Sequence, residues 1–199
     1  QVDLRGGGIR YKIFTADSHR PVGEIDGFRA LTETHPGAIY LHNGVAHQVR
    51  ELDLQRHAVR ISKARVNYYT QVRAEKTTEL LEVFEQKQLG NLKVSLGRLR
   101  VTQQVVGFEK RRIQTREKLS EHRLDLPPQM FETEGFWLAF PDDMLPSAAG
   151  MDTLGGLHAA EHAAIGMLPL VVLCDRNDLG GFATLLQPQL KAAAIFLYD

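Results

Sequence analysis

The chain has a single cysteine, Cys174, among its 199 residues. One cysteine cannot form a disulfide within the chain, nor can it supply a four-cysteine zinc site. We expect Cys174 to serve as a small buried hydrophobic residue. No apolar run approaches the roughly 20 residues that a membrane-spanning helix needs. The sequence also begins without a basic leader and apolar segment, so it predicts no secretory signal and a cytoplasmic location without membrane contact.

Nucleotide-binding motifs are also missing from the sequence. It contains neither G-x-x-x-x-G-K-[ST] nor G-x-G-x-x-G, the glycine-rich loops that hold nucleotide phosphates. It contains no internal repeat either. We therefore expect no nucleotide cofactor within these residues.

The net charge of zero hides an uneven distribution of charge along the chain. Up to Leu124 there are 22 Lys and Arg residues against 14 Asp and Glu residues, and from Asp125 onward there are 2 against 10. A basic front part is typical of proteins that contact nucleic acid. Attraction between the two oppositely charged parts explains the same distribution equally well.

The first 75 residues are patterned as short strands. Asn43-Gly44 separates two apolar runs, residues 38–42 and 45–49, and this arrangement predicts a type I′ β-hairpin. Further strands are expected in "IRYKIF" and within residues 58–72, whereas residues 21–27 are typical of a turn. Several short strands at this spacing predict a small β-barrel-like module over residues 1–75.

The middle of the chain predicts a long two-stranded excursion over residues 97–118, where apolar and charged residues alternate. Residues 77–90 fit either a short helix or a strand. Pro127-Pro128 cannot continue a sheet ladder, so an element boundary is expected there, followed by a strand around residues 136–140.

An alanine-rich segment, residues 153–168, has apolar residues at helical spacing, and Pro169 must end that helix. "AAAIFLYD" then predicts a buried strand. The fold class expected from these patterns is α+β. The β-barrel-like module is followed, over residues 76–199, by a mixed β-sheet domain with the alanine-rich helix packed on it.

The same helix carries His158, Glu161 and His162 in the spacing H-x-x-E-H, which is also that of the inverted zinc proteases. Residues i, i+3 and i+4 share one helix face, so the three side chains can converge. A catalytic zinc needs a third protein ligand, which in those proteases is a downstream glutamate, and no glutamate follows Glu161. We therefore predict a structural polar cluster that includes Asp175 and Asp178, and no metal site. A non-catalytic metal site and a zinc metallohydrolase are the less favoured alternatives.

Six segments in order resemble the C-terminal region of the MrfA/YprA-type superfamily-two DNA helicases, including the MrfA zinc-binding domain. They are "HPGAIYLHNG", "VRELDL", "VNYYTQVR", "VVGFEK", "LDLPPQMFETEGFWLAFP" and "LHAAEHAAIGMLPLVVLCDRNDLGG". The resemblance covers nearly the whole chain, and six short matches in order make coincidence improbable.

This resemblance implies an ATP-dependent 3′-to-5′ DNA helicase that acts in DNA repair. In the family, motor domains that use ATP and magnesium precede this region, and a zinc ion is held by four cysteines. We expect the motor motifs before Gln1 and the cysteines after Asp199, so that residues 76–199 form a zinc-binding-like domain truncated before its cysteine cluster. The polar cluster would then have a scaffolding role.

Two hypotheses follow for these residues, neither of which assigns them a catalytic group. In the first, the region binds and guides DNA, which we expect to be single-stranded, and braces the motor domains; in the second it is purely an inter-domain scaffold. Phosphate binding needs clustered cations, and "EKRRIQTREK" supplies them, although a solvated charged hairpin is an equal alternative. Tyr68, Tyr69 and Phe108 are candidates for base stacking, although strand aromatics more often belong to the core. The predicted phosphate-binding residues are Lys110, Arg111, Arg112, Arg116 and Lys118.

Overall fold

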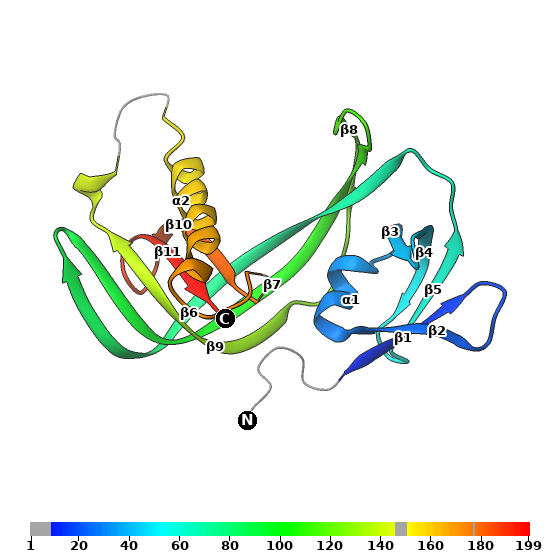
Figure 1. Cartoon of the computed structure of the whole chain (residues 1–199), viewed down its shortest axis with the longest axis horizontal. Helices are drawn as coiled ribbons and strands as arrows, with labels where there is room; N and C mark the ends of the chain where they lie inside the picture. Colours follow the sequence, from blue (N-terminus) through cyan, green and yellow to red (C-terminus); the bar gives the residue numbers. More distant parts are fainter. Residues whose placement is uncertain (1–8, 146–150, 177) are drawn as a thin grey trace. The chain divides into compact units, whose positions relative to one another are not determined.

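The computed structural model describes residues 9–145, 151–176 and 178–199 (Figure 1). Contacts within the chain define two compact units. The first consists of Gln1–Glu75 and Gln103–Gln129, and the second of Lys76–Thr102 and Met130–Asp199. The contacts thus group residues 103–129 with the front of the chain, while the predicted pair of domains, 1–75 and 76–199, stays a prediction.

A five-stranded sheet forms most of the first unit, in the order β2-β1-β5-β4-β3. Strands β1 and β5 are parallel, and the other neighbours are antiparallel. The prediction of a turn over residues 21–27 is wrong, because most of them pair with β1 as a strand. The strands are β1 (Arg10–Thr15), β2 (Pro21–Asp26), β3 (Ile39–His42), β4 (Val45–Asp53) and β5 (Ala58–Lys63).

The hairpin predicted at Asn43-Gly44 is confirmed. Strands β3 and β4 pair antiparallel, with His42 opposite Val45 across the two-residue turn. Asn43 has φ 49° and Gly44 has φ 77°, the two positive values that a type I′ turn requires. Asn and Gly tolerate this backbone better than other residues do, which is why the sequence signal was specific.

A short helix, α1 (Gly27–Glu33), follows β2 and was not predicted. The carboxylate of Asp26 caps it by accepting a hydrogen bond from the Phe28 amide at 2.8 Å. Ala30 and Leu31 face inward from this helix. Ala30 joins a core with Ile13, Val59 and other apolar side chains of the sheet, while Leu31 packs with Val105 and Leu126.

Two long strands, β6 (Tyr68–Leu89) and β7 (Leu92–Arg112), extend through both units, and β8 (Lys118–Arg123) pairs with the end of β7. Residues 77–89 are therefore strand, which resolves the ambiguity between helix and strand. Gly90, with φ 59°, provides the left-handed residue of the tight turn between β6 and β7. A two-stranded excursion was predicted over residues 97–118, but residues 97–112 belong to the single strand β7 and the second strand, β8, begins only at Lys118.

The second unit is built on β9 (Gln129–Phe140), β10 (Gly180–Gln187) and β11 (Ala192–Tyr198), in the order β10-β11-β9-β7-β6. Strand β9 starts directly after Pro127-Pro128, at the predicted boundary. Trp137 and Phe196 are fully buried in this unit, with ring centroids 6.2 Å apart. The predicted closing strand is confirmed, since nearly all of β11 is buried.

Side chains from the turn between β10 and β11 reach the far strand of the same sheet. Gln189 accepts a hydrogen bond from the Leu80 amide at 2.7 Å and donates one to the Leu80 carbonyl at 2.9 Å. Gln187 donates to the Thr78 carbonyl at 2.8 Å. The two ends of the strand order are thereby brought together, so this sheet curls into a half-barrel.

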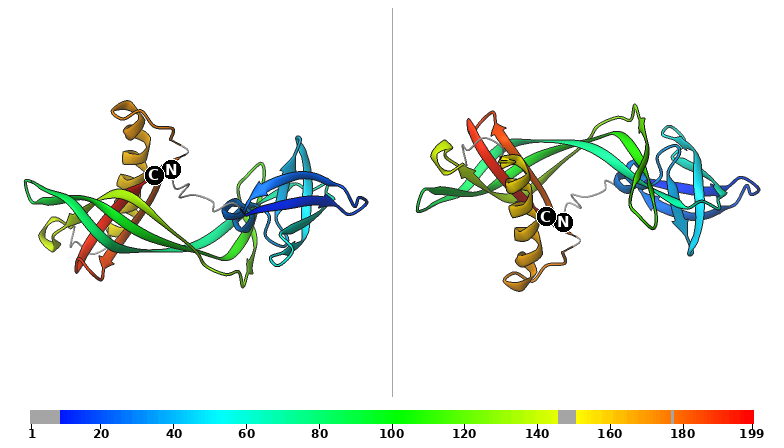
Figure 2. Two further views of the ribbon diagram at one scale, coloured as in Figure 1. Left: turned by 90° about the horizontal axis from the view of Figure 1, so that it is seen from below. Right: turned by 90° about the horizontal axis from the view of Figure 1, so that it is seen from above.

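The alanine-rich helix is α2 (Thr153–Met167), and it packs against β10 and β11 as predicted (Figure 2). Its inward side chains include Leu157 and Ile165, which meet Ile195 and Leu197 of β11. A 3₁₀ turn containing Pro169, η2 (Leu168–Leu170), ends the helix, and another, η1 (Asp142–Met144), follows β9.

The architecture is mostly β-sheet with two α-helices, which is compatible with the predicted α+β class. In the first unit the strand order leaves β2 and β3 as edges among the described residues, so the pairing there is that of an open sheet. No helix among the described residues is long and apolar enough to cross a membrane.

Candidate nucleic-acid interface

The predicted phosphate-binding cations lie on the hairpin formed by β7 and β8. In its register Glu109 faces Glu121 and Arg111 faces Lys118, with an irregularity after Lys110. Because alternate residues of a strand share a face, acidic and basic side chains are interleaved on one side of the hairpin. The sequence predicted the cations, but it could not show which of them the carboxylates contact.

Glu109 pairs with two of the predicted cations. Its carboxylate accepts hydrogen bonds from Arg111 at 2.6 and 2.9 Å, and it lies 2.9 Å from the Lys118 ammonium. Hydrogen bonds from Lys118 and Arg111 lower the pKa of Glu109 below its usual value. Lys118 also donates to Glu121 at 2.5 Å, and Glu121 pairs in turn with Arg73.

The remaining predicted cations differ in their partners. The Nε of Arg112 is shielded from solvent and lies 3.5 Å from the Glu117 carboxylate, an ion-pair contact without a hydrogen bond among the described residues. Arg116 is exposed at the turn, with φ 57°, and no carboxylate of the described residues pairs with it. Lys110 lies over the Tyr68 ring, 5.4 Å from its centroid. Of the predicted cations, Lys110 and Arg116 therefore have no carboxylate partner among the described residues.

Phe108 is not available for base stacking. Its ring is 4% exposed and lies between two histidine rings, His35 at 4.5 Å and His122 at 4.8 Å between centroids. Gly37, with φ 85°, passes close to the Phe108 ring, where a Cβ atom would come within 3.0 Å. This stack joins the hairpin to the rest of the first unit, so the stacking role considered for Phe108 is wrong. Tyr68 and Tyr69 are half-buried.

His35 is buried at the end of the stack, with 1% of its surface exposed. Its Nδ1 lies 3.1 Å from the Pro36 carbonyl oxygen. Burial lowers the pKa of His35, because the charged ring would lose its hydration, and the Pro36 carbonyl opposes this effect in part.

The polar cluster predicted on α2 is partly assembled. His158 Nδ1 lies 2.8 Å from a Glu161 carboxylate oxygen, and the Nε2 atoms of His158 and His162 are 3.1 Å apart. The three donor groups lie within 4.8 Å of one another. Among the described residues they are the group of this kind close enough to share a metal ion, and Asp175 and Asp178 are outside it.

Glu161, rather than the histidines, lies on the buried face of α2. It is 4% exposed, at the i+4 position between Leu157 and Ile165. Gly181 passes over its carboxylate so closely that a Cβ atom there would lie 2.4 Å from Oε1. Lys76 donates to the Gly181 carbonyl at 3.3 Å, and burial lowers the pKa of Lys76 while the charge of Glu161 raises it. No local sequence pattern pointed to Lys76 or Gly181, which both lie outside the helix.

Asp175 and Asp178 lie in the turn after η2, where the Asp178 amide donates to the Asp175 carbonyl at 3.1 Å. Cys174 is half-buried, so it is less enclosed than the small buried hydrophobic residue that was predicted. A four-cysteine zinc site does not fit the residues of this chain, because Cys174 is its one cysteine.

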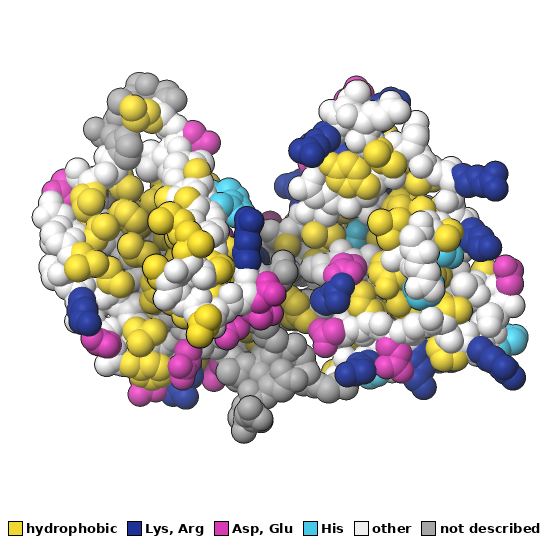
Figure 3. Space-filling view, viewed as in Figure 1, with side chains coloured by type: hydrophobic (Ala, Val, Ile, Leu, Met, Phe, Trp, Pro, Cys, Tyr) yellow, Lys and Arg dark blue, Asp and Glu magenta, His cyan; other side chains and the backbone are white. Residues whose placement is uncertain are grey.

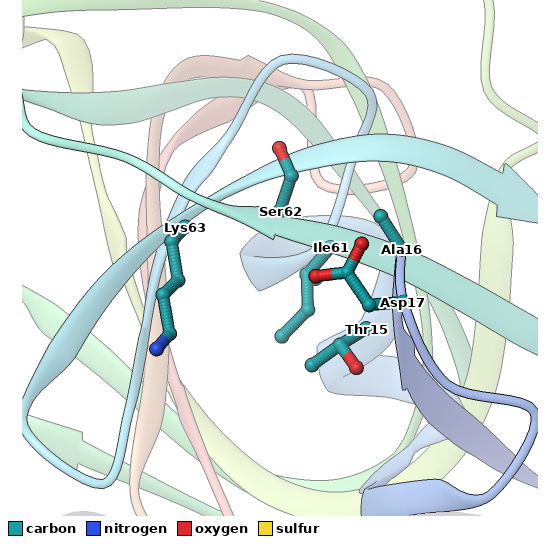
Figure 4. A pocket seen from close by; sticks show the side chains of 6 residues that line it. All are labelled: Thr15, Ala16, Asp17, Ile61, Ser62 and Lys63. Atoms are coloured by element: carbon teal, nitrogen blue, oxygen red, sulfur yellow. The ribbon is translucent and has the colours of Figure 1, made fainter.

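Two further surface features of the described residues, a pocket and a group of exposed hydrophobic side chains, do not bring together a set of catalytic or metal-binding groups. A shallow pocket at the ends of β1 and β5 is lined by Thr15, Ala16, Asp17, Ile61, Ser62 and Lys63 (Figure 4). In the second unit, hydrophobic side chains gather around α2 (Figure 3). They include a run of exposed residues after the helix: Leu170, Val171, Val172 and Leu173.

No family model matches the chain, but known proteins do. It is 29% identical over 183 residues to the uncharacterized ATP-dependent helicase YprA of Bacillus subtilis, an alignment that covers 90% of this chain and 24% of YprA. It is 23% identical over 187 residues to the ATP-dependent helicase HRQ1 of Saccharomyces cerevisiae, with 89% of this chain and 17% of HRQ1 covered.

Solved structures agree with these sequence matches. A crystal structure of the DUF1998 helicase MrfA bound to DNA matches 96% of this chain and 26% of its own, with a TM-score of 0.67 and 28% identity. A second MrfA structure, 23% identical with a TM-score of 0.64, supports the fold. The resemblance to a region of the MrfA/YprA-type helicases is confirmed, and the chain spans about a quarter or less of the relatives' length.

Proposed function

We propose that this chain is an accessory region of an ATP-dependent DNA helicase, in which it binds and guides DNA and braces the motor domains. The observation that carries the proposal is the match of 96% of the chain to a DUF1998 helicase bound to DNA. In this proposal the motor domains supply ATP hydrolysis with magnesium, and these residues supply no chemistry of their own. A role in DNA repair, 3′-to-5′ movement, the superfamily-two class and a cysteine-bound zinc belong to the same proposal.

The β7–β8 hairpin is the part of the first unit that we propose for contact with the DNA backbone. Arg116 at its turn and Lys110 on its flank have no carboxylate partner among the described residues. Arg111 and Lys118 pair with Glu109, but their own side chains are 32% and 44% exposed, so each could contact a phosphate by leaving or sharing this carboxylate.

Backbone contact makes a quantitative prediction for the variant Lys110→Ala/Arg116→Ala. For single-stranded DNA the slope of log affinity against log salt is about −0.7 per phosphate contact, so losing two contacts should make the slope shallower by about 1.4. We expect the affinity at low salt to fall several-fold. The measurement is the fluorescence anisotropy of a labelled single-stranded oligonucleotide, titrated at several salt concentrations beside a duplex of the same sequence.

A matched control separates contact from loss of net charge. Lys93→Ala/Arg98→Ala also removes one lysine and one arginine, but from the β7 segment of the second unit. It should leave both the slope and the affinity close to those of the unaltered chain. Equal losses in the two variants would mean that the hairpin is not the contact surface.

A second candidate function is that of a purely structural scaffold between domains. The observation that favours it is the neutralisation of Arg111 and Lys118 by Glu109 and Glu121 within the hairpin itself. A folded sample that binds neither oligonucleotide at low salt would support the scaffold. The metallohydrolase alternative has no third ligand of the expected type, and we propose the polar cluster of α2 as a scaffolding feature.

A further inference from the structure

We propose that His158 and His162 form a binding site for a divalent transition metal ion of the Zn²⁺ type on the outer side of α2. This site lies in the second unit and does not depend on the role of the β7–β8 hairpin in the proposed function. Neither the H-x-x-E-H hydrolase chemistry nor a cysteine cluster is needed for it.

The ligand geometry is set by the helix. The two histidines are one turn apart, and their Nε2 atoms converge to a separation of 3.1 Å. Two Zn–N bonds of about 2.05 Å place their nitrogens about 3.3 Å apart at a tetrahedral angle and about 2.9 Å apart at a right angle. The observed separation lies between these values, so it is compatible with one ion bound by both nitrogens.

Glu161 orients the first ligand. Its carboxylate oxygen lies 2.8 Å from His158 Nδ1, so the Nδ1–H donates to it and the Nε2 of this ring keeps its lone pair for a ligand. This carboxylate–histidine pairing is the usual outer-shell arrangement of metal-binding imidazoles. Gly181, whose carbonyl accepts a hydrogen bond from Lys76, passes close to the Glu161 carboxylate on its other side and limits the room in which it can move.

The two histidine side chains are accessible to a metal ion from solvent. His158 has a side chain that is 59% exposed, and His162 is exposed as well, while the glutamate beneath them is buried. Water would complete the coordination of an ion held by two imidazoles. Imidazole nitrogen selects Zn²⁺, Cu²⁺ and Ni²⁺ over Mg²⁺ and Ca²⁺, which prefer oxygen ligands.

The competing explanation is that the two rings share a proton and nothing else. In that case an Nε2–H of one histidine donates to the Nε2 of the other, with the same 3.1 Å separation. The two explanations predict different results when Zn²⁺ is added. If the rings form a metal site, Zn²⁺ replaces the shared proton and binds, whereas Mg²⁺ does not bind to imidazole nitrogen.

Isothermal titration of the chain with Zn²⁺ tests the proposal, with Mg²⁺ as the negative probe. We expect one Zn²⁺ per chain and an affinity that falls at least tenfold in His162→Gln. This variant leaves the His158–Glu161 contact in place, so circular dichroism should show the helix unchanged. The control His19→Gln removes an exposed histidine of the first unit and should bind Zn²⁺ as the unaltered chain does.

A second variant tests the orienting role of Glu161. Glu161→Gln keeps an acceptor for His158 but removes its charge, and we expect Zn²⁺ affinity to fall about 10–100-fold while both ligands remain. Zn²⁺ should also raise the melting temperature of the unaltered chain and not that of His162→Gln. Absence of Zn²⁺ binding at one equivalent, or binding by His162→Gln that is as tight as in the unaltered chain, would overturn the proposal.

Discussion

At the scale of single residues, His35 links stability to pH. Its folded-state pKa is lowered by burial against Phe108, whereas in the unfolded chain the ring titrates near its ordinary value of about 6.5. Between the lowered pKa and 6.5 the unfolded chain therefore binds more protons than the folded chain does. Stability should be complete above about pH 6.5 and should be lost as the pH falls toward the folded-state pKa.

The corresponding prediction concerns the variant His35→Phe. In the unaltered chain the free energy of unfolding should fall between pH 7 and pH 5, and His35→Phe should lose part of this fall, whatever its absolute stability. The measurement is urea unfolding followed by circular dichroism at several pH values. His19→Gln, which changes an exposed histidine outside the stack, should keep the pH dependence of the free energy of unfolding. An equal loss of pH dependence in His19→Gln would mean that His35 is not its source.

Some of the site residues could be predicted from the sequence because their contacts are local, and others could not because their contacts join distant segments. The H-x-x-E-H spacing is local, so the convergence of His158, Glu161 and His162 on one turn of helix could be predicted. The contact of Lys76 with Gly181 joins residues 105 positions apart, and no local pattern reports it. The pairing of Lys118 with Glu109 likewise depends on the register of β7 against β8, which an irregularity after Lys110 shifts.

At the scale of elements, residues 77–89 show tertiary structure overriding local preference. Their glutamates and leucines suit a helix as well as a strand. Glu79 and Glu82 accept hydrogen bonds from Arg100 and Arg98 across the sheet, at 2.8 and 2.6 Å, and such cross-strand pairs favour the strand. The elements that could be predicted, such as the Asn43-Gly44 hairpin, carry their determinants within a few residues.

Close approach of β6 and β7 gives a prediction for Gly97→Ala. A Cβ atom at Gly97 would lie 2.0 Å from the Glu82 carbonyl oxygen and 3.0 Å from Trp137, so the two strands must separate. We expect the free energy of unfolding to fall by about 1–3 kcal/mol, the usual cost of overpacking. Thermal unfolding followed by circular dichroism measures it.

The matched control for this substitution is Gly156→Ala on α2. A Cβ atom there meets nothing within 4 Å, so the only expected effect is the better helix propensity of alanine. The control should therefore gain about 0.5–1 kcal/mol. Equal destabilisation in the two variants would contradict the close strand approach at Gly97.

At the scale of the whole molecule, the chain passes between its two units three times, at residues 75–76, 102–103 and 129–130. A division into consecutive domains is the simplest expectation from sequence, because strand pairing between distant segments leaves no local pattern. The first unit instead takes Val105, Phe108 and Leu126 from the segment 103–129.

This division predicts how fragments behave. A fragment of residues 1–75 lacks the side chains that cover Leu31 and His35, so it should unfold at much lower urea concentrations than a fragment of residues 1–129, which retains them. Urea unfolding and resistance to proteolysis compare the two. If residues 1–75 alone unfold cooperatively at the same urea concentration, the segment 103–129 is not part of the first unit's core.

The hydrogen bonds that curl the second sheet join segments that are synthesised at different times. Lys76 is bonded to a residue 105 positions later, and Leu80 to one 109 positions later. A ribosome that adds about 5–20 residues per second needs roughly 5–20 s to make the intervening chain. During that interval one side of β6 has no partner, and an open strand edge is a template for pairing with other chains. Strand β6 is therefore most exposed to aggregation until the segment that carries Gly181 and Gln189 has been made, and it is then that a chaperone would serve it best.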